Sequence, residues 1–141
     1  MAMEQAGMSV IVWASVLEVE QYLAQITKLA GCLPDIDHAA LADPPSKMII
    51  ERPAGPSIAR YQLYQTPGRT EWRIGEPVGY HGTIAAFGDV SLTQLRSTLS
   101  QETATAEDGL SSVHGSFLRE LAHRIEAEHV RAHPPIPSSL V

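Results

Sequence analysis

Hydrophobic and polar positions alternate through the middle of the chain with the period of strands. In 58–65, Ala59, Tyr61 and Leu63 alternate with polar neighbours, which predicts one buried and one exposed strand face. Four further short apolar runs predict strands at 10–13, 47–53, 70–75 and 83–88. With a Pro-Gly turn at 66–69, these strands should form a largely antiparallel sheet.

Two segments combine a capping box with apolar residues at helical spacing. Ser15 and Glu18 open a predicted helix over 16–30, which should end at Gly31. Ser91 and Gln94 form a similar pair. Because Leu92, Leu95 and Leu99 follow at spacings of three and four, a second helix is predicted there.

The last predicted helix runs from Leu110 to Arg131 and ends before the prolines that follow His133. On a helical wheel its apolar residues share one arc, into which His114 also falls. The members of this arc are Leu110, Phe117, Leu118, Leu121 and Ile125. This helix should pack against the sheet through that arc.

These elements predict a single α+β domain over residues 1–141. Its order is β-α-β-β-β-β-α-α, with a mostly antiparallel sheet of about five strands and three helices in two layers. We expect residues 1–7 and 134–141 to be flexible tails, since neither carries a helix or strand pattern. The length of 141 residues is sufficient for a core that needs no metal or disulfide.

Charge and composition narrow the classes of function. Ten basic and sixteen acidic residues give a net charge of -6, which disfavours nucleic acid and anionic lipid as partners. No apolar run approaches the roughly 20 residues that span a bilayer. The single cysteine, Cys32, permits no internal disulfide, so we expect a cytoplasmic protein. No phosphate-binding motif is present, and no cofactor is expected.

Four of the six histidines lie between Ser111 and His133, in the last predicted helix or directly after it, which raises the question of a metal site. Glu126, His129 and His133 share one flank at spacings of three and four, as metal ligands on a helix can. However, His133 precedes a proline and no further ligand is tied to the set by spacing. A solvated helix face is therefore the preferred interpretation, with no metal expected.

His114 differs from the other histidines because it lies on the apolar arc. A buried imidazole needs a hydrogen-bond partner, so His114 is either a satisfied core residue or part of a pocket lining. The glycine-rich stretch 75–82 carries Tyr80 and His81, whose polar tips could contact a ligand. These three residues define an alternative function, a small enzyme or small-molecule binder with a pocket between the sheet and the C-terminal helix.

The absence of a recognisable catalytic constellation favours a different main prediction. It is a small acidic module that binds another protein without catalysis, like an immunity protein, chaperone or adaptor. The partner should have a basic surface, and the acidic loop residues Asp35, Asp37 and Asp43 are the predicted contacts. A homodimer is also expected, because a strand edge and an amphipathic helix both need covering.

Overall fold

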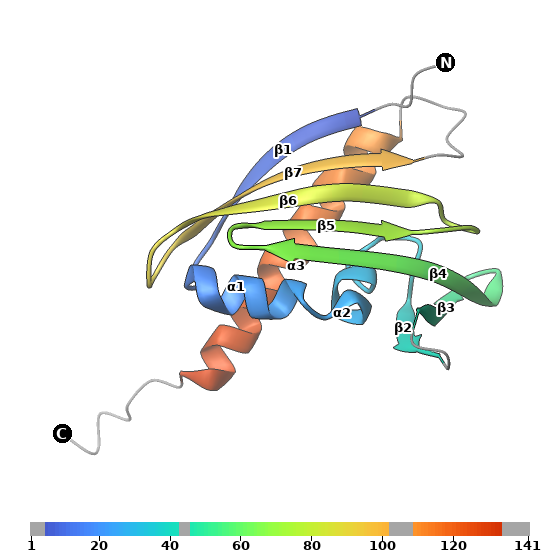
Figure 1. Ribbon diagram of the computed structural model, residues 1–141, viewed down its shortest axis with the longest axis horizontal. Coiled ribbons are helices and arrows are strands. Elements are labelled where there is room, and N and C mark those ends of the chain that lie inside the picture. Colours follow the sequence, from blue (N-terminus) through green and yellow to red (C-terminus); the bar gives the residue numbers. More distant parts are fainter. Residues whose placement is uncertain (1–4, 43–45, 102–108, 134–141) are drawn as a thin grey trace.

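The computed structural model describes residues 5–42, 46–101 and 109–133 (Figure 1). The elements, in chain order, are β1 (Gln5–Val12), α1 (Val16–Leu23), α2 (Ile26–Ala30), β2 (His38–Leu41), β3 (Lys47–Arg52), β4 (Gly55–Thr66), β5 (Arg69–Ile74), β6 (Tyr80–Gly88), β7 (Thr93–Gln101) and α3 (Leu110–Ala132). Within these ranges, no helix is long and apolar enough to cross a membrane. The predicted α+β class is confirmed.

The seven strands form one antiparallel sheet in the order β1-β7-β6-β5-β4-β3-β2. The predicted number of five strands was too small. β1 and β2 are consecutive in the chain but lie at opposite edges of the sheet, and α1 with α2 carries the chain from one edge to the other (Figure 1). The central strands β3 to β7 follow one another as antiparallel neighbours, as the predicted antiparallel sheet required.

One face of the sheet, here called the inner face, packs against α3, which runs diagonally behind it and contacts chiefly β1 and β7 among the strands (Figure 1). Along β5, Thr70, Trp72 and Ile74 are buried while the residues between them are exposed. The Trp72 and Phe117 rings lie 5.5 Å apart, which joins the sheet to α3. The predicted apolar arc of α3 is therefore the face that closes the core. We call the opposite, solvent-facing side of the sheet the outer face.

The helix predicted from Ser91 is wrong, because this segment forms strand β7 and the turn before it. The Asp89 carboxylate accepts hydrogen bonds from the backbone N–H groups of Ser91 and Leu92. Ser91 therefore belongs to a turn and does not cap a helix. Leu95 and Leu99 fit a period of two as well as a helical spacing. Pairing with β1 on one side and β6 on the other decides between them.

Three boundaries also differ from the sequence prediction. β1 includes residues 5–7, which had been placed in a flexible tail. The predicted helix 16–30 is divided, since Gln25 adopts an extended conformation between α1 and α2 although it is no helix breaker. β2 was missed because three of its four residues are exposed, so it has no alternating pattern. The predicted tail 134–141 lies outside the described residues.

The capping box at the start of α1 is confirmed. The Ser15 hydroxyl accepts a hydrogen bond from the Glu18 N–H at 3.1 Å, and the Glu18 carboxylate accepts one from the Ser15 N–H at 3.2 Å. Two backbone donors that the first turn leaves unpaired are thereby satisfied. Val19 and Leu23 then face the core from the same helix.

Ser15→Ala should lower the free energy of unfolding by about 1 kcal/mol, since the cap oxygen is lost. Chemical denaturation followed by circular dichroism measures this change. Ser112→Ala is the matched control, because Ser112 is exposed within α3 and alanine suits a helix interior. Equal destabilisation by both substitutions would contradict the role assigned to the cap.

Candidate functional site

His114 lies on α3 beneath the inner face of the sheet and is fully buried. Its Nε2 atom is hydrogen bonded to the Ser97 hydroxyl of β7 at 2.8 Å. Its Nδ1 atom has no hydrogen-bond partner among the described residues. Burial lowers the pKa of His114 below its usual value, so the imidazole is neutral at neutral pH. The sequence left open a satisfied core histidine or a pocket residue, and only one of the two ring nitrogens is satisfied.

Trp72 contributes a second buried polar atom to the same face. Its side chain is 3% exposed, and within the described part of the chain the indole Nε1 has no hydrogen-bond partner. In the sheet register, Trp72 lies opposite Gly82, and Gly82 lies opposite Leu99. Leu99 is two residues from Ser97 on β7, so Trp72 and Ser97 lie on the same face of the sheet. A buried polar group without a partner costs about 1–3 kcal/mol. Trp72 lies in the strand predicted over 70–75, and the sequence pattern gave no sign of this donor.

Tyr80 and His81 are neighbours in sequence but face opposite sides of β6. Tyr80 lies on the inner face, where its hydroxyl donates to the Asp35 carboxylate at 3.3 Å. Burial, with the nearby Asp35 charge, raises the pKa of Tyr80 well above its usual value. His81 lies on the outer face, and burial together with Arg73 lowers its pKa. The structure therefore places Tyr80 and His114 on one side of the sheet and His81 on the other.

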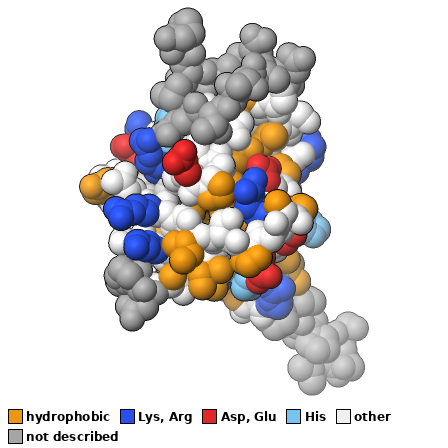
Figure 2. Space-filling view, turned by 90° about the vertical axis from the view of Figure 1, so that its right-hand side faces the viewer, with side chains coloured by type: hydrophobic (Ala, Val, Ile, Leu, Met, Phe, Trp, Pro, Cys, Tyr) orange, Lys and Arg blue, Asp and Glu red, His pale blue; other side chains and the backbone are white. Residues whose placement is uncertain are grey.

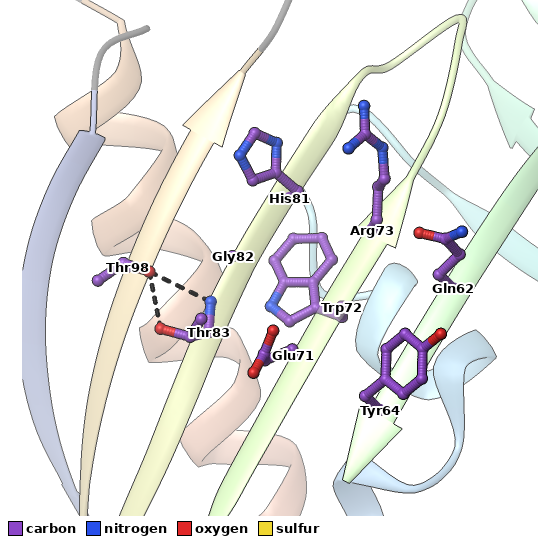
Figure 3. A pocket seen from close by; sticks show the side chains of 9 residues that line it. All are labelled: Gln62, Tyr64, Glu71, Trp72, Arg73, His81, Gly82, Thr83 and Thr98. Atoms are coloured by element: carbon purple, nitrogen blue, oxygen red, sulfur yellow. Dashed lines mark hydrogen bonds between the residues drawn. The ribbon is translucent and has the colours of Figure 1, made fainter.

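A cavity of about 220 Å³ lies on the outer face around His81 (Figure 3). It is lined by Gln62, Tyr64, Glu71, Trp72, Arg73, His81, Gly82, Thr83 and Thr98. The Thr83 and Thr98 hydroxyls are hydrogen bonded to each other at 2.8 Å, and Glu71 pairs with Arg69 at 3.4 Å. Their polar groups are thus already compensated within the protein.

A groove of about 340 Å³ separates α3 from the segment that follows α2. Its lining residues are Gly31, Cys32, Leu33, Pro34, Ile36, Asp37, Ser116, Glu120 and Arg124. Cys32 and Ile36 are buried, so the floor of the groove is continuous with the apolar core. Burial raises the pKa of the Cys32 thiol to about 11, which makes it a poor nucleophile at neutral pH.

The acidic loop does not form one exposed patch. Asp35 is half-buried and directed at Tyr80, whereas Asp37 is exposed and its N–H donates to the Glu51 carbonyl. Asp43 lies outside the described residues. Asp35 and Asp37 therefore differ from each other in exposure and in the groups they contact.

The predicted ligand set Glu126, His129 and His133 is divided. Glu126 accepts a hydrogen bond from the Trp13 N–H at 2.9 Å, at the end of β1. His129 and His133 instead face Glu18, a residue of α1. The two histidines lie side by side, as their spacing indicated, but the carboxylate beside them is Glu18 and not Glu126.

Comparison with known proteins gave matches at the level of structure alone. No family model and no curated protein matches the sequence. The Zhui aromatase/cyclase from Streptomyces sp. R1128 superimposes with a TM-score of 0.66 at 19% identity, covering 96% of this chain and 100% of that one. A START superfamily protein from Mycobacterium smegmatis gives a TM-score of 0.63 at 14% identity, covering 90% and 97%. Protein XoxI from Bacillus cereus gives 0.65 at 17% identity, covering 87% and 96%. The chain therefore has a fold like that of START and aromatase/cyclase proteins.

The prediction of a non-catalytic protein-interaction module is wrong, because the fold is like that of proteins named as START and aromatase/cyclase members. The predicted protein partner with a basic surface, and the homodimer with it, are corrected on the same ground. The face shown in Figure 2 carries Lys and Arg side chains beside hydrophobic ones, with acidic side chains scattered among them. The alternative, a small-molecule binder or small enzyme, agrees better with these comparisons.

Gly82→Ala should destabilise the protein by about 1–3 kcal/mol, as overpacking of a well-packed site does. A Cβ atom at Gly82 would lie 2.2 Å from the Thr98 carbonyl oxygen and 3.3 Å from Trp72 Nε1. Gly7→Ala is the matched control, since a Cβ there meets nothing within 4 Å. Thermal denaturation compares the two variants, and equal midpoints would refute the close approach at Gly82.

The buried imidazole of His114 predicts a pH dependence of stability. Its folded pKa is lowered, so below the usual value of 6.5 the unfolded chain binds a proton that the folded chain does not. Stability should therefore fall as the pH drops below about 6.5, by at most about 1.4 kcal/mol per pH unit for one proton. Urea denaturation between neutral and mildly acidic pH should show a flatter dependence for His114→Gln. The exposed His123→Gln should retain the wild-type slope, and an unchanged slope in His114→Gln would contradict the assignment.

Proposed function

We propose that the chain binds a small organic molecule between α3 and the inner face of the sheet. The observation that carries this proposal is that two buried polar atoms on this face, His114 Nδ1 and Trp72 Nε1, have no hydrogen-bond partner among the described residues. Native interiors rarely leave such atoms unpaired, because each one loses its hydrogen bonds to water and gains nothing in return. A ligand with a hydroxyl or carbonyl group at this place would satisfy them.

The surroundings of these atoms favour a largely apolar, aromatic molecule. Trp72 and Phe117 present ring surfaces at 5.5 Å, and Leu99 and Leu118 add aliphatic side chains to the same core. Ligand sites commonly combine such an apolar lining with a few polar groups that fix orientation. The similarity of the fold to proteins named aromatase/cyclase supports the same class of ligand.

The groove beside α3 supplies a route to this place. Ser116 lines the groove, and the next residue, Phe117, is fully buried and packs on Trp72. The cavity on the outer face is the weaker location, because its hydroxyl groups and Glu71 are already paired.

Naphthol is a suitable probe, since it joins an aromatic surface to one hydroxyl group. We expect its addition to shift the indole N–H signal of Trp72 in a saturable way in proton–nitrogen correlation spectra. Trp13, which is 65% exposed, is the second tryptophan and serves as an internal control in the same spectrum.

Two variants test which face of the sheet binds naphthol. His114→Gln should weaken naphthol binding roughly 2- to 10-fold, the equivalent of one hydrogen bond. His81→Gln, on the outer face, should leave the affinity unchanged. A response of Trp13 alone, or a loss of binding in His81→Gln but not in His114→Gln, would refute the proposed location.

A further inference from the structure

Three potential metal ligands meet where α1 and α3 lie side by side. They are Glu18 on α1, His129 on α3 and His133 at the C-terminal cap of α3. One donor atom from each lies within 4.8 Å of the other two. The Glu18 Oε2 atom is 2.8 Å from His129 Nδ1 and 3.2 Å from His133 Nε2. Ligands bound to one zinc ion at about 2.0–2.2 Å lie at similar or slightly larger separations.

The fold prepares each ligand for this arrangement. His129 and His133 are four residues apart, so they lie on the same side of α3, and their rings are 4.7 Å apart. The Ser15 N–H and hydroxyl both donate to Oε1 of Glu18, which orients the carboxylate. Oε1 is 2.9 Å from His129 Nδ1, while Oε2 contacts both histidines. Outer hydrogen bonds of this kind fix ligand orientation in known metal sites.

Neighbouring contacts hold α3 to the segments on either side of α1. Lys28 and Glu128 form an ion pair at 2.6 Å between α2 and α3. The backbone N–H of Trp13 donates to Glu126 on the preceding turn of α3. The C-terminus of α3 also favours a cation, because its partial negative charge lies beside His129 and His133.

Space remains for a further ligand. A cavity of about 180 Å³ adjoins the cluster and is lined by Glu18, Gln21, Tyr22, Gln25, Ile125, Glu128, His129 and Ala132. Sites with three protein ligands and one open position hold water or a small molecule as the fourth ligand. The exposed fractions of the Glu18 and His129 side chains are 24% and 32%, so an ion can reach them from solvent.

We propose that Glu18, His129 and His133 form a binding site for a divalent transition-metal ion of the zinc class, with an open fourth position. Two imidazoles and one carboxylate suit zinc, cobalt, nickel or copper better than magnesium or calcium, which prefer oxygen ligands. The site is separate from the proposed ligand site beneath α3 and does not depend on it.

Metal titration of protein made without a histidine tag and stripped with a chelator tests the site. Zinc should bind saturably with one ion per chain and raise the thermal midpoint as its concentration exceeds the dissociation constant. Cobalt should give visible absorption bands of a low-coordinate site, and zinc should abolish them. Absence of stoichiometric binding to the wild-type protein would overturn the proposal.

Variants identify the ligands. Glu18→Gln keeps a residue that still completes a capping box but removes the charge. His129→Gln and His133→Asn move the donor atom while keeping polarity. Each should lower the zinc affinity by more than the roughly 10- to 100-fold that loss of an outer hydrogen bond costs. Circular dichroism should show that the three variants retain the fold.

Two matched controls lie on the same helix. His123→Gln removes an exposed histidine outside the cluster, and Glu126→Gln removes the carboxylate that sequence spacing assigned to the site while retaining an acceptor for the Trp13 N–H. Both should bind zinc as the wild-type protein does. Binding that survives all three ligand substitutions, or that is lost equally in the controls, would refute the site.

Discussion

The packing of α3 against the inner face of the sheet is the constraint on which the rest of the structure depends. An isolated seven-stranded sheet would leave Trp72 and its apolar neighbours in water, and α3 alone would expose Phe117 and Leu121. Each layer therefore requires the other, since neither can bury its apolar face alone. The same contact determines the chemistry, because it removes His114 from water together with the side chains around it.

The sequence patterns predicted those parts of the fold whose apolar residues fit either the strand period of two or the helix period of 3.6, but not both. The alternation in β4 and β5 and the apolar arc of α3 have a single interpretation, and both were confirmed. Thr93–Gln101 failed because its leucines satisfy both periods. Only the ladder partners distinguish them, and β1 lies at the far end of the chain from β7. Local information could not supply that pairing.

The candidate sites could also be predicted only in part, because their residues are brought together by elements that are distant in sequence. His114 was recognised because a histidine on an apolar arc is visible in sequence. The opposite orientation of Tyr80 and His81 follows from strand pairing, whereas a glycine-rich segment looks like a loop. Glu18 could not be joined to His129 by spacing, since α1 and α3 come from different ends of the chain. Candidate residues were therefore easier to name than their partners.

The position of β1 also has a consequence for the order in which the chain can fold during synthesis. The ladder from β3 to β7 grows by adding each strand to the one made just before it. Among the described strands β1 emerges first, yet it pairs with β7, which emerges last of them. Closing so long a loop is entropically costly and slows folding. β1 therefore has no strand to pair with until β7 has been made.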